Sequence, residues 1–366
     1  MTGWQQPAPG EHEAGERAWE VVREAYAERI AAPRARDKRP FLLVAVAAAL
    51  VAAALSPPGH AVWGSLRNAV QKEDHLLSLP GPGRILVNAQ AGAWVVQRDG
   101  SKRFIAGYTN AAWSPHGLYL AAVRGNQLVA MEPNGKVHWK LARRQPVGGP
   151  TWSFDGYRIA YLSGRELRVV NGDGTNDRLI VPNAGGTQLA AYAWRPGTHQ
   201  LAYNIGKDRL VLLDVDARRV LWRGRAAGLE QLLWSEDGRR LFVSGPPRIL
   251  TASGRLVATV PAGDPAAFLP HSHAIALVTV KNGVSTVAIY SGPRYRNRRV
   301  VFSGAGLFGG IDWSPDGRWL LIDWRDADQW LFIRSAAVRR IAVRNIGNTF
   351  DSGPEHYATL AGWCCP

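Results

Sequence analysis

Trp313-Ser-Pro-Asp-Gly317 decides the fold, because this five-residue box is one of a series along the chain. The other boxes begin at Trp113, Trp152, Trp194, Trp234 and, in degenerate form, Phe268. Successive boxes start 39, 42, 40, 34 and 45 residues apart. That period fits the four short strands of a propeller blade. The repeat therefore predicts an all-β propeller.

Each repeat has the same internal order. An apolar segment precedes the tryptophan, as in Leu232-Leu233-Trp234, and Asp-Gly then supplies the positive-φ turn of a hairpin. Strands are expected to follow, such as 158–162 and 166–170 in the second repeat. The large planar side chain of each box is expected to fill the wedge between neighbouring sheets.

The two ends of the repeat region complement each other. Residues 84–106 contain three predicted strands with no box in front, whereas 360–366 resemble a box with nothing behind. We therefore expect Trp363 to lie on the inner strand of the blade whose outer strands come from 84–106, which removes an exposed sheet edge. This count gives seven blades, or six if the weak Phe268 unit forms no blade of its own.

The boxes, with stretches such as Tyr157-Arg-Ile-Ala-Tyr-Leu-Ser163, resemble the TolB-type WD40-like (PD40) propeller repeat family over residues 84–366. The match is good at the second and sixth boxes and poor at the third and fifth. The motif is structural, so the resemblance implies a fold and carries almost no function. The layout also resembles actinobacterial-type proteins with a propeller after one N-terminal anchor, and the family usually supplies interaction or ligand-binding scaffolds at the cell envelope.

The segment before the propeller predicts a membrane anchor. Residues 40–60 hold fifteen consecutive apolar residues, 41–55, which span about 22 Å as a helix. The hydrocarbon core is roughly 30 Å thick, so the span requires a thinned bilayer or a longer helix. Basic residues at 34–39 place the N-terminus in the cytosol and the propeller outside the cell membrane. Cleavage after Ala61 and a merely buried helix remain alternatives.

The flanks of this anchor have their own predictions. Residues 1–39 form a predicted cytosolic segment with an amphipathic helix at 11–30. That helix either lies on lipid or pairs with itself, or it docks a cytosolic partner. Residues 61–83 are expected to form a juxtamembrane helix and linker.

Charge and cysteine content limit the possible partners. The net charge is +15, but 37 of the basic residues are arginine, 7 are lysine, and they are scattered. This pattern indicates genomic base composition and argues against nucleic-acid binding. Cys364 and Cys365 are the only cysteines, and neighbours rarely bridge each other without strain, so no disulfide framework is expected. Packing, a soft metal and cross-linking to another chain remain open for the pair.

Motifs for chemistry are missing. The sequence has no Gly-x-Ser-x-Gly elbow, no phosphate-binding Gly-x-x-x-x-Gly-Lys loop and no His-Glu-x-x-His pair. We therefore expect a binding module without a cofactor. His271 and His273, with Asp264 as a third ligand, are weak candidates for a metal site. The alternative is that they are surface histidines in a loop. Residues 173–177 faintly resemble a calcium loop but lack its final glutamate and fall at a turn.

Polar residues on the predicted inner strands are the remaining candidates. We take as possible ligand-binding residues near the central channel Asn110, Thr151, Tyr192, Gln231 and Asp312. Alternatively, they hydrogen-bond neighbouring blades. The expected function is a binding module for a protein, peptide or glycan at the envelope. A channel-mouth hydrolase or lyase acting on envelope polymer, using Asp312 or the histidine pair, is one alternative, and a purely structural scaffold is another.

Overall fold

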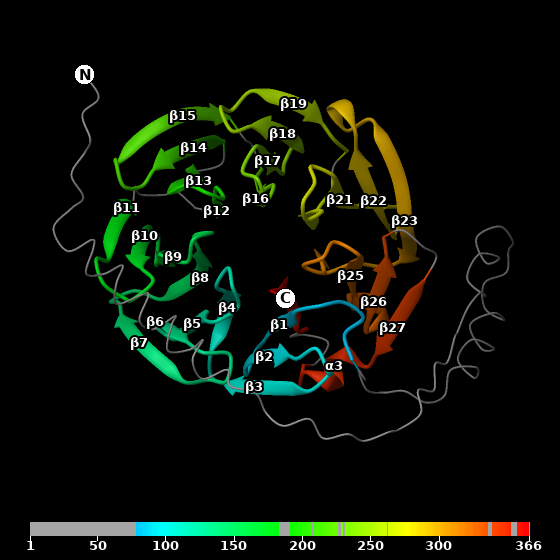
Figure 1. Ribbon diagram of the computed structural model, residues 1–366, viewed down its shortest axis with the longest axis horizontal. Coiled ribbons are helices and arrows are strands. Elements are labelled where there is room, and N and C mark those ends of the chain that lie inside the picture. The colour runs from blue at the N-terminus through cyan, green and yellow to red at the C-terminus, as the bar shows by residue number, and fades with distance from the viewer. Residues whose placement is uncertain are drawn as a thin grey trace, which may run out of the picture. The chain divides into compact units, whose positions relative to one another are not determined.

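The computed structural model describes residues 78–182, 191–205, 208–225, 228–229, 231–261, 263–335, 339–352 and 357–365. These residues form seven four-stranded antiparallel sheets. The sheets follow one another around a ring, and the inner strand of each contacts the inner strands of its two neighbours (Figure 1). The all-β propeller with seven blades is therefore confirmed, and the six-bladed alternative is wrong.

Four blades make up the first part of the ring. Blade 1 consists of β28 (Thr359–Cys364), β1 (Arg84–Ala89), β2 (Gly92–Val96) and β3 (Lys102–Ala106). Blade 2 consists of β4 (Thr109–Trp113), β5 (Leu120–Arg124), β6 (Gln127–Met131) and β7 (Val137–Ala142). Blade 3 consists of β8 (Val147–Trp152), β9 (Arg158–Ser163), β10 (Glu166–Asn171) and β11 (Arg178–Val181). Blade 4 consists of β12 (Tyr192–Trp194), β13 (Gln200–Ile205), β14 (Arg209–Asp214) and β15 (Arg219–Arg225).

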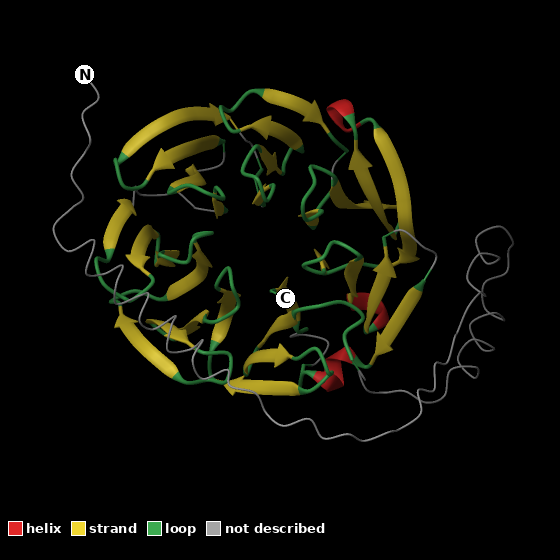
Figure 2. Ribbon diagram, viewed as in Figure 1, coloured by secondary structure: helices red, strands yellow, loops and turns green. Residues whose placement is uncertain are grey.

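Three blades complete it. Blade 5 consists of β16 (Leu232–Trp234), β17 (Arg240–Val243), β18 (Arg248–Thr251) and β19 (Leu256–Thr259). Blade 6 consists of β20 (Ala266–Phe268), β21 (Ile275–Lys281), β22 (Val284–Ser291) and β23 (Asn297–Ala305). Blade 7 consists of β24 (Gly310–Trp313), β25 (Trp319–Trp324), β26 (Gln329–Arg334) and β27 (Arg340–Arg344). Strands dominate, and the described helices are short: η1 (Pro293–Tyr295), η2 (Arg325–Ala327) and α3 (Ile346–Thr349) (Figure 2).

The box residues build the turn between the first and second strands of a blade. In blade 3, the Ser153 hydroxyl donates to Asp155 Oδ1 at 2.5 Å and accepts from the Arg158 N–H at 2.9 Å. Gly156 then takes the left-handed conformation, at φ 76°, that glycine adopts without strain. The equivalent residues of blades 5 and 7 make the same bonds. We call the side of the ring that carries these turns the box face, and the other side the far face.

The box tryptophans pack between blades, as the sequence predicts. Trp194, Trp313 and Trp363 are each at most 5% exposed. The indole of Trp194 donates to Thr151 O of the preceding blade at 3.0 Å, and that of Trp313 donates to Ala267 O at 3.3 Å. These rings therefore join neighbouring sheets both by burial and by a hydrogen bond.

The ring closes through the C-terminal segment. β28 pairs antiparallel with β1, with Trp363 opposite Ile85, so the predicted closure is confirmed. The Trp363 indole also donates to Pro82 O at 2.8 Å. The two adjacent cysteines at the end of this segment are bonded to each other, against the sequence expectation. Cys365 takes φ 63°, a left-handed turn of the backbone that accompanies the bond.

Phe268 does head a blade of its own. β20 pairs with β21, and Phe268 lies opposite Ile275 in that pairing. The two longest strands of the described part, β22 and β23, belong to this same blade. The degenerate box thus retains its structural role, because an apolar ring still fills the inner-strand position.

The predictions for residues 1–77 lie outside the described residues. They include the helix at 11–30, the anchor at 40–60 and most of the linker at 61–83. Within the described part of the chain, no helix is long and apolar enough to cross a membrane.

Candidate functional site

The five predicted site residues are spread over five blades. Thr151 and Tyr192 meet across the seam between blades 3 and 4, since both hydroxyls donate to Gly149 O. Asn110 lies on β4, is exposed, and takes φ 48° where the pairing of β4 with β5 shifts register. The structure therefore brings two of the five together and leaves Asn110 apart.

Gln231 and Asp312 each tie one blade to the next. The Gln231 amide accepts from Ala266 N–H at 3.0 Å and donates to Ala266 O at 3.2 Å, which fixes blade 5 to the inner strand of blade 6. Asp312 accepts from Trp363 N–H at 2.6 Å and from Trp313 N–H at 2.8 Å. Burial raises the pKa of Asp312 to about 6, although these two N–H groups lower it in part.

The histidine pair contacts acidic residues of the neighbouring blade. His273 Nε2 lies 2.8 Å from Asp237 Oδ2, and His271 Nδ1 lies 3.0 Å from Glu236 Oε2. Among the described residues, no three histidine, cysteine or acidic side chains meet as a metal site. In the faint calcium loop, the carboxylate of Asp177 pairs with Arg143 and Arg168 instead.

Sequence reasoning missed one buried acid, Asp323 at the end of β25. Its side chain is 1% exposed, and its Oδ1 has no hydrogen-bond partner among the described residues. Burial raises its pKa to about 7, against the lowering influence of the Tyr357 hydroxyl and the Arg325 guanidinium. The Tyr357 hydroxyl is likewise buried without a well-aligned partner in the described part of the protein. Burial thus favours the protonated form of this carboxyl.

The equivalent strand position in other blades shows what is unusual about Asp323. Asn88 accepts from Ala111 N–H at 2.8 Å, and Asn204 accepts from Ala191 N–H at 2.9 Å. Ser244 of blade 5 accepts from Gln231 N–H at 2.8 Å in the same way. In these blades a neutral side chain accepts a hydrogen bond from the backbone of an inner strand or of the residue just before it. Comparing the tenth residue after each box aromatic residue, which is Asn204 after Trp194, Ser244 after Trp234 and Asp323 after Trp313, would have revealed the acid from sequence.

Asp323 and Asp312 share one face of blade 7. Asp323 lies opposite Gly310 in the pairing of β24 with β25, and Asp312 lies opposite Leu321, two residues before Asp323. Because side chains alternate along strands, both carboxyls project toward blade 1. A Cβ on Gly309 would lie 3.1 Å from Asp323 Oδ2, so glycine lets the linker pass close to the acid. We call Asp312, Asp323, Arg325 and Tyr357 the closure-seam site.

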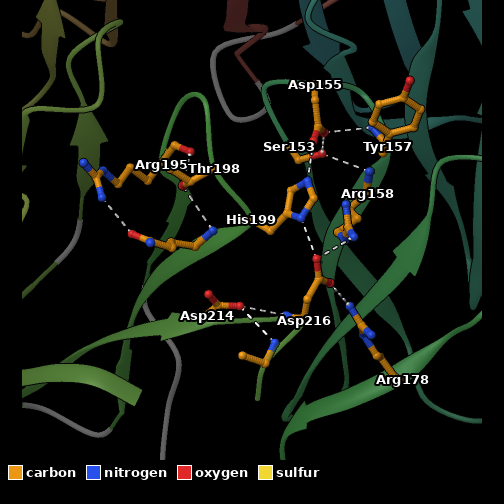
Figure 3. Close-up of polar contacts among 12 residues, drawn as sticks. Ser153, Asp155, Tyr157, Arg158, Arg178, Arg195, Thr198, His199, Asp214 and Asp216 are labelled. Atoms are coloured by element: carbon orange, nitrogen blue, oxygen red, sulfur yellow. Dashed lines mark hydrogen bonds and ion pairs between the residues drawn. The ribbon is translucent and has the colours of Figure 1, made fainter. Parts of the chain in front are cut away.

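A second polar cluster lies on the box face between blades 3 and 4. His199 lies between two carboxylates, with Nε2 at 2.8 Å from Asp155 Oδ2 and Nδ1 at 2.5 Å from Asp216 Oδ2 (Figure 3). Arg158 and Arg178 reach Asp216 at 2.7 and 2.8 Å. Each ring nitrogen lies against a carboxylate oxygen, an arrangement that favours the protonated imidazole.

The pKa shifts in this cluster agree with that geometry. The hydrogen bond to Asp155 raises the pKa of His199. Burial opposes ionisation of Asp155, but His199 and Ser153 lower its pKa to about 2. The serine hydroxyl donates to Asp155 and not to the histidine, so His199 does not activate Ser153 as a nucleophile. It latches two blades together.

Comparisons with known proteins show the fold and no more. No protein-family model matches the chain, and no curated protein matches it by sequence. The chain is similar to a chain of the crystal structure titled Mitotic Checkpoint Complex, with 17% identity, TM-score 0.56, and coverage of 82% of this chain and 99% of that one. It is also similar to a putative 6-phosphogluconolactonase from Bacteroides fragilis, with 14% identity, TM-score 0.55, and coverage of 77% of this chain and 97% of that one. A third similar structure is the dihydro-heme d1 dehydrogenase NirN in complex with DHE, with 13% identity, TM-score 0.51, and coverage of 80% of this chain and 77% of that one. All three are distant in sequence, so these likenesses bear on the fold alone.

Proposed function

We propose that this protein is a binding scaffold, anchored in the cell membrane by residues 40–60, with its propeller on the extracytoplasmic side. Its partner is a protein, peptide or glycan of the envelope. The observation that supports this most directly is how the ring uses its polar groups. Gln231, Asp312 and His199 each connect two blades, so the described polar chemistry serves to keep a rigid surface in shape.

The contacts of the histidines also support binding over catalysis. His138, His199, His271 and His273 all lie against carboxylates. A hydrolase of the serine or cysteine type needs a histidine against the nucleophile. A structure of similar fold belongs to a protein complex, which is consistent with a propeller serving as an assembly surface.

The test is crosslinking of the full-length protein in its own membranes, followed by mass spectrometry. A scaffold is expected to give a reproducible set of envelope partners that is lost when the propeller is unfolded. The absence of any partner above an anchor-only control would contradict the proposal. A parallel experiment without residues 1–39 tests the cytosolic helix, because the loss of a partner subset would assign that subset to residues 11–30.

One observation favours a second candidate, a hydrolase or lyase acting on envelope polymer. The closure-seam site holds two buried carboxyls with raised pKa values, about 6 for Asp312 and about 7 for Asp323. Such values suit general acid–base catalysis near neutral pH. Release of soluble fragments from isolated envelope by the wild type, but not by Asp323→Asn, would establish this activity. Equal release by both proteins would exclude Asp323 as its acid or base.

A further inference from the structure

Six of the seven outermost strands carry lysine or arginine, and the seventh, β19, carries no charged residue. Together they hold eleven lysine and arginine residues and no aspartate or glutamate. Charge on an edge strand discourages pairing with other sheets, which accounts for single basic residues spread around the ring. It does not account for arginines that are gathered in one place.

Four arginines gather at the far-face end of blades 4 and 5. Arg223 and Arg225 are exposed on β15 and project from the same side of the strand. Arg209 of β14 lies directly opposite Arg225. Arg248 of β18 reaches across the seam and donates to Arg225 O at 2.5 Å. We call these four residues the β15 arginine cluster. Like charges placed directly opposite each other destabilise a sheet.

At two other places this chain provides a carboxylate for a pair of arginines. Arg158 and Arg178 share Asp216, at 2.7 and 2.8 Å. Another pair, Arg143 and Arg168, shares Asp177, at 2.6 and 2.9 Å. Each pair brackets a single acid, and the guanidinium groups are held in charged hydrogen bonds.

The β15 arginine cluster has no such acid. None of its members takes part in an ion pair with any described residue. Asp208 adjoins Arg209 in sequence, yet it is exposed and pairs with none of the four in the described part of the chain. The cluster therefore has the donors of a carboxylate site and, among the described residues, lacks the carboxylate.

The strand that carries the cluster is also open to pairing. β15 is the last strand of its sheet, and no described strand pairs with its outer edge. An extended segment that adds to this edge places alternate side chains on one face, about 7 Å apart. Residues i and i+2 of such a segment match the positions of Arg223 and Arg225.

We propose that the β15 arginine cluster is a docking site for an extended, acidic segment of a partner protein, which pairs with the edge of β15. Carboxylates at alternate positions of that segment bind Arg223 and Arg225, and Arg209 and Arg248 complete the positive surround. This inference deepens the proposed scaffold function and rests on it. It names the partner as an acidic peptide segment.

The test uses the full-length protein and a fluorescent ten-residue peptide with glutamate at every second position and threonine between. Its neutral twin carries glutamine in place of glutamate. Binding of the acidic peptide is expected, with at least tenfold weaker binding of the twin, and with a marked loss of affinity as salt rises. Equal binding of both peptides, or no binding of the acidic one, overturns the proposal.

Variants locate the site. Arg223→Gln with Arg225→Gln is expected to weaken peptide binding at least tenfold. The matched control, Arg298→Gln with Arg299→Gln on the outermost strand of blade 6, is expected to change it less than twofold. Equal weakening by both variants would mean diffuse charge attraction and overturn the site. Unfolding midpoints confirm that the variants fold, and the β15 variant is expected to be no less stable than the wild type because it relieves repulsion.

Two further measurements distinguish the acidic peptide from other polyanions, and the docking site from the scaffold function. Single-stranded DNA and vesicles containing anionic lipid are measured against the same variants. Tighter binding of either, lost in the β15 variant, would replace the acidic segment with that polyanion and overturn the proposal. If the peptide fails while membrane crosslinking still yields protein partners, the docking site is wrong and the scaffold function stands. If crosslinking yields no partners while the peptide binds, the scaffold function is wrong and the docking site stands.

Discussion

Replacing Asp323 with asparagine removes a buried carboxyl and keeps its shape. Burial raises the pKa of Asp323 from an ordinary 3.8 to about 7. The difference is about 3 units, and each unit corresponds to about 1.4 kcal/mol. The carboxylate form therefore lowers the free energy of unfolding by about 4 kcal/mol once it is fully ionised in the folded protein.

The sign follows from proton binding. Between pH 4 and 7 the folded protein holds a proton on Asp323 that the unfolded chain has lost. The free energy of unfolding of the wild type therefore falls as pH rises through this window, and the full penalty is present above pH 7. Asparagine does not titrate. We expect Asp323→Asn to match the wild type near pH 4 and to exceed it by up to about 4 kcal/mol at pH 8.

The assay is urea unfolding of the full-length protein, followed by tryptophan fluorescence from pH 4.5 to 8. Asp351→Asn is the control, because Asp351 is an exposed acid of the same region and its replacement is expected to leave the pH profile unchanged. A variant profile parallel to that of the wild type would refute the reasoning. So would a variant less stable than the wild type at pH 8, since that result would mean the carboxylate is stabilised by partners in the folded state.

Substitutions at three further residues test which contacts hold the blades together. His199→Gln is expected to lower the free energy of unfolding by about 1 kcal/mol or less below pH 6, because the pair of His199 with Asp155 is partly exposed. Since the pKa of His199 is raised in the folded protein, this difference is expected to disappear as the pH rises through that pKa. Thermal melts of both proteins at pH 5.5 and 9 would show the change. Trp363→Ala is expected to cost about 3–5 kcal/mol, because a side chain 5% exposed is lost from the closing strand, and limited proteolysis would then cut the C-terminal segment first. Gln231→Ala is expected to cost about 1–3 kcal/mol by leaving Ala266 N–H without its acceptor, and Gln231→Glu, which keeps the acceptor, is expected to recover part of that loss in chemical denaturation.

The fold was largely predictable because the same pattern of strands and turns recurs in each repeat. The spacing of the boxes implies blades, and the boxless start with the lone Trp363 at the end implies closure, which the pairing of Trp363 with Ile85 confirms. Even the weak Phe268 unit forms a blade, since local strand and turn preferences survive the loss of the tryptophan. Periodic burial and turn chemistry are local properties, so sequence reveals them.

The candidate site was predictable only in part. Asp312 stands out by sequence because it interrupts an apolar inner strand. Asp323 does not stand out, because what makes it unusual is the burial between blade 7 and Tyr357, a residue 34 positions later that returns beside it. Pairings such as His199 with Asp155, and Arg158 with Asp216, likewise join different blades. Contacts between blades depend on how the sheets stack, which a single repeat does not encode.

The two acids of the closure-seam site separate a structural role from a functional one. Asp312 accepts hydrogen bonds from two backbone N–H groups of the inner strands, and its pKa rises only to about 6. Asp323 has an oxygen with no donor among the described residues, and its pKa rises further, to about 7. Asparagine holds the equivalent position in blades 1 and 4, where it bonds a strand at no cost in charge. A role in packing alone is therefore served better by asparagine than by the acid. The presence of an acid at this position of blade 7 makes Asp323, and not Asp312, the residue of this site where a ligand or a transferred proton is to be sought.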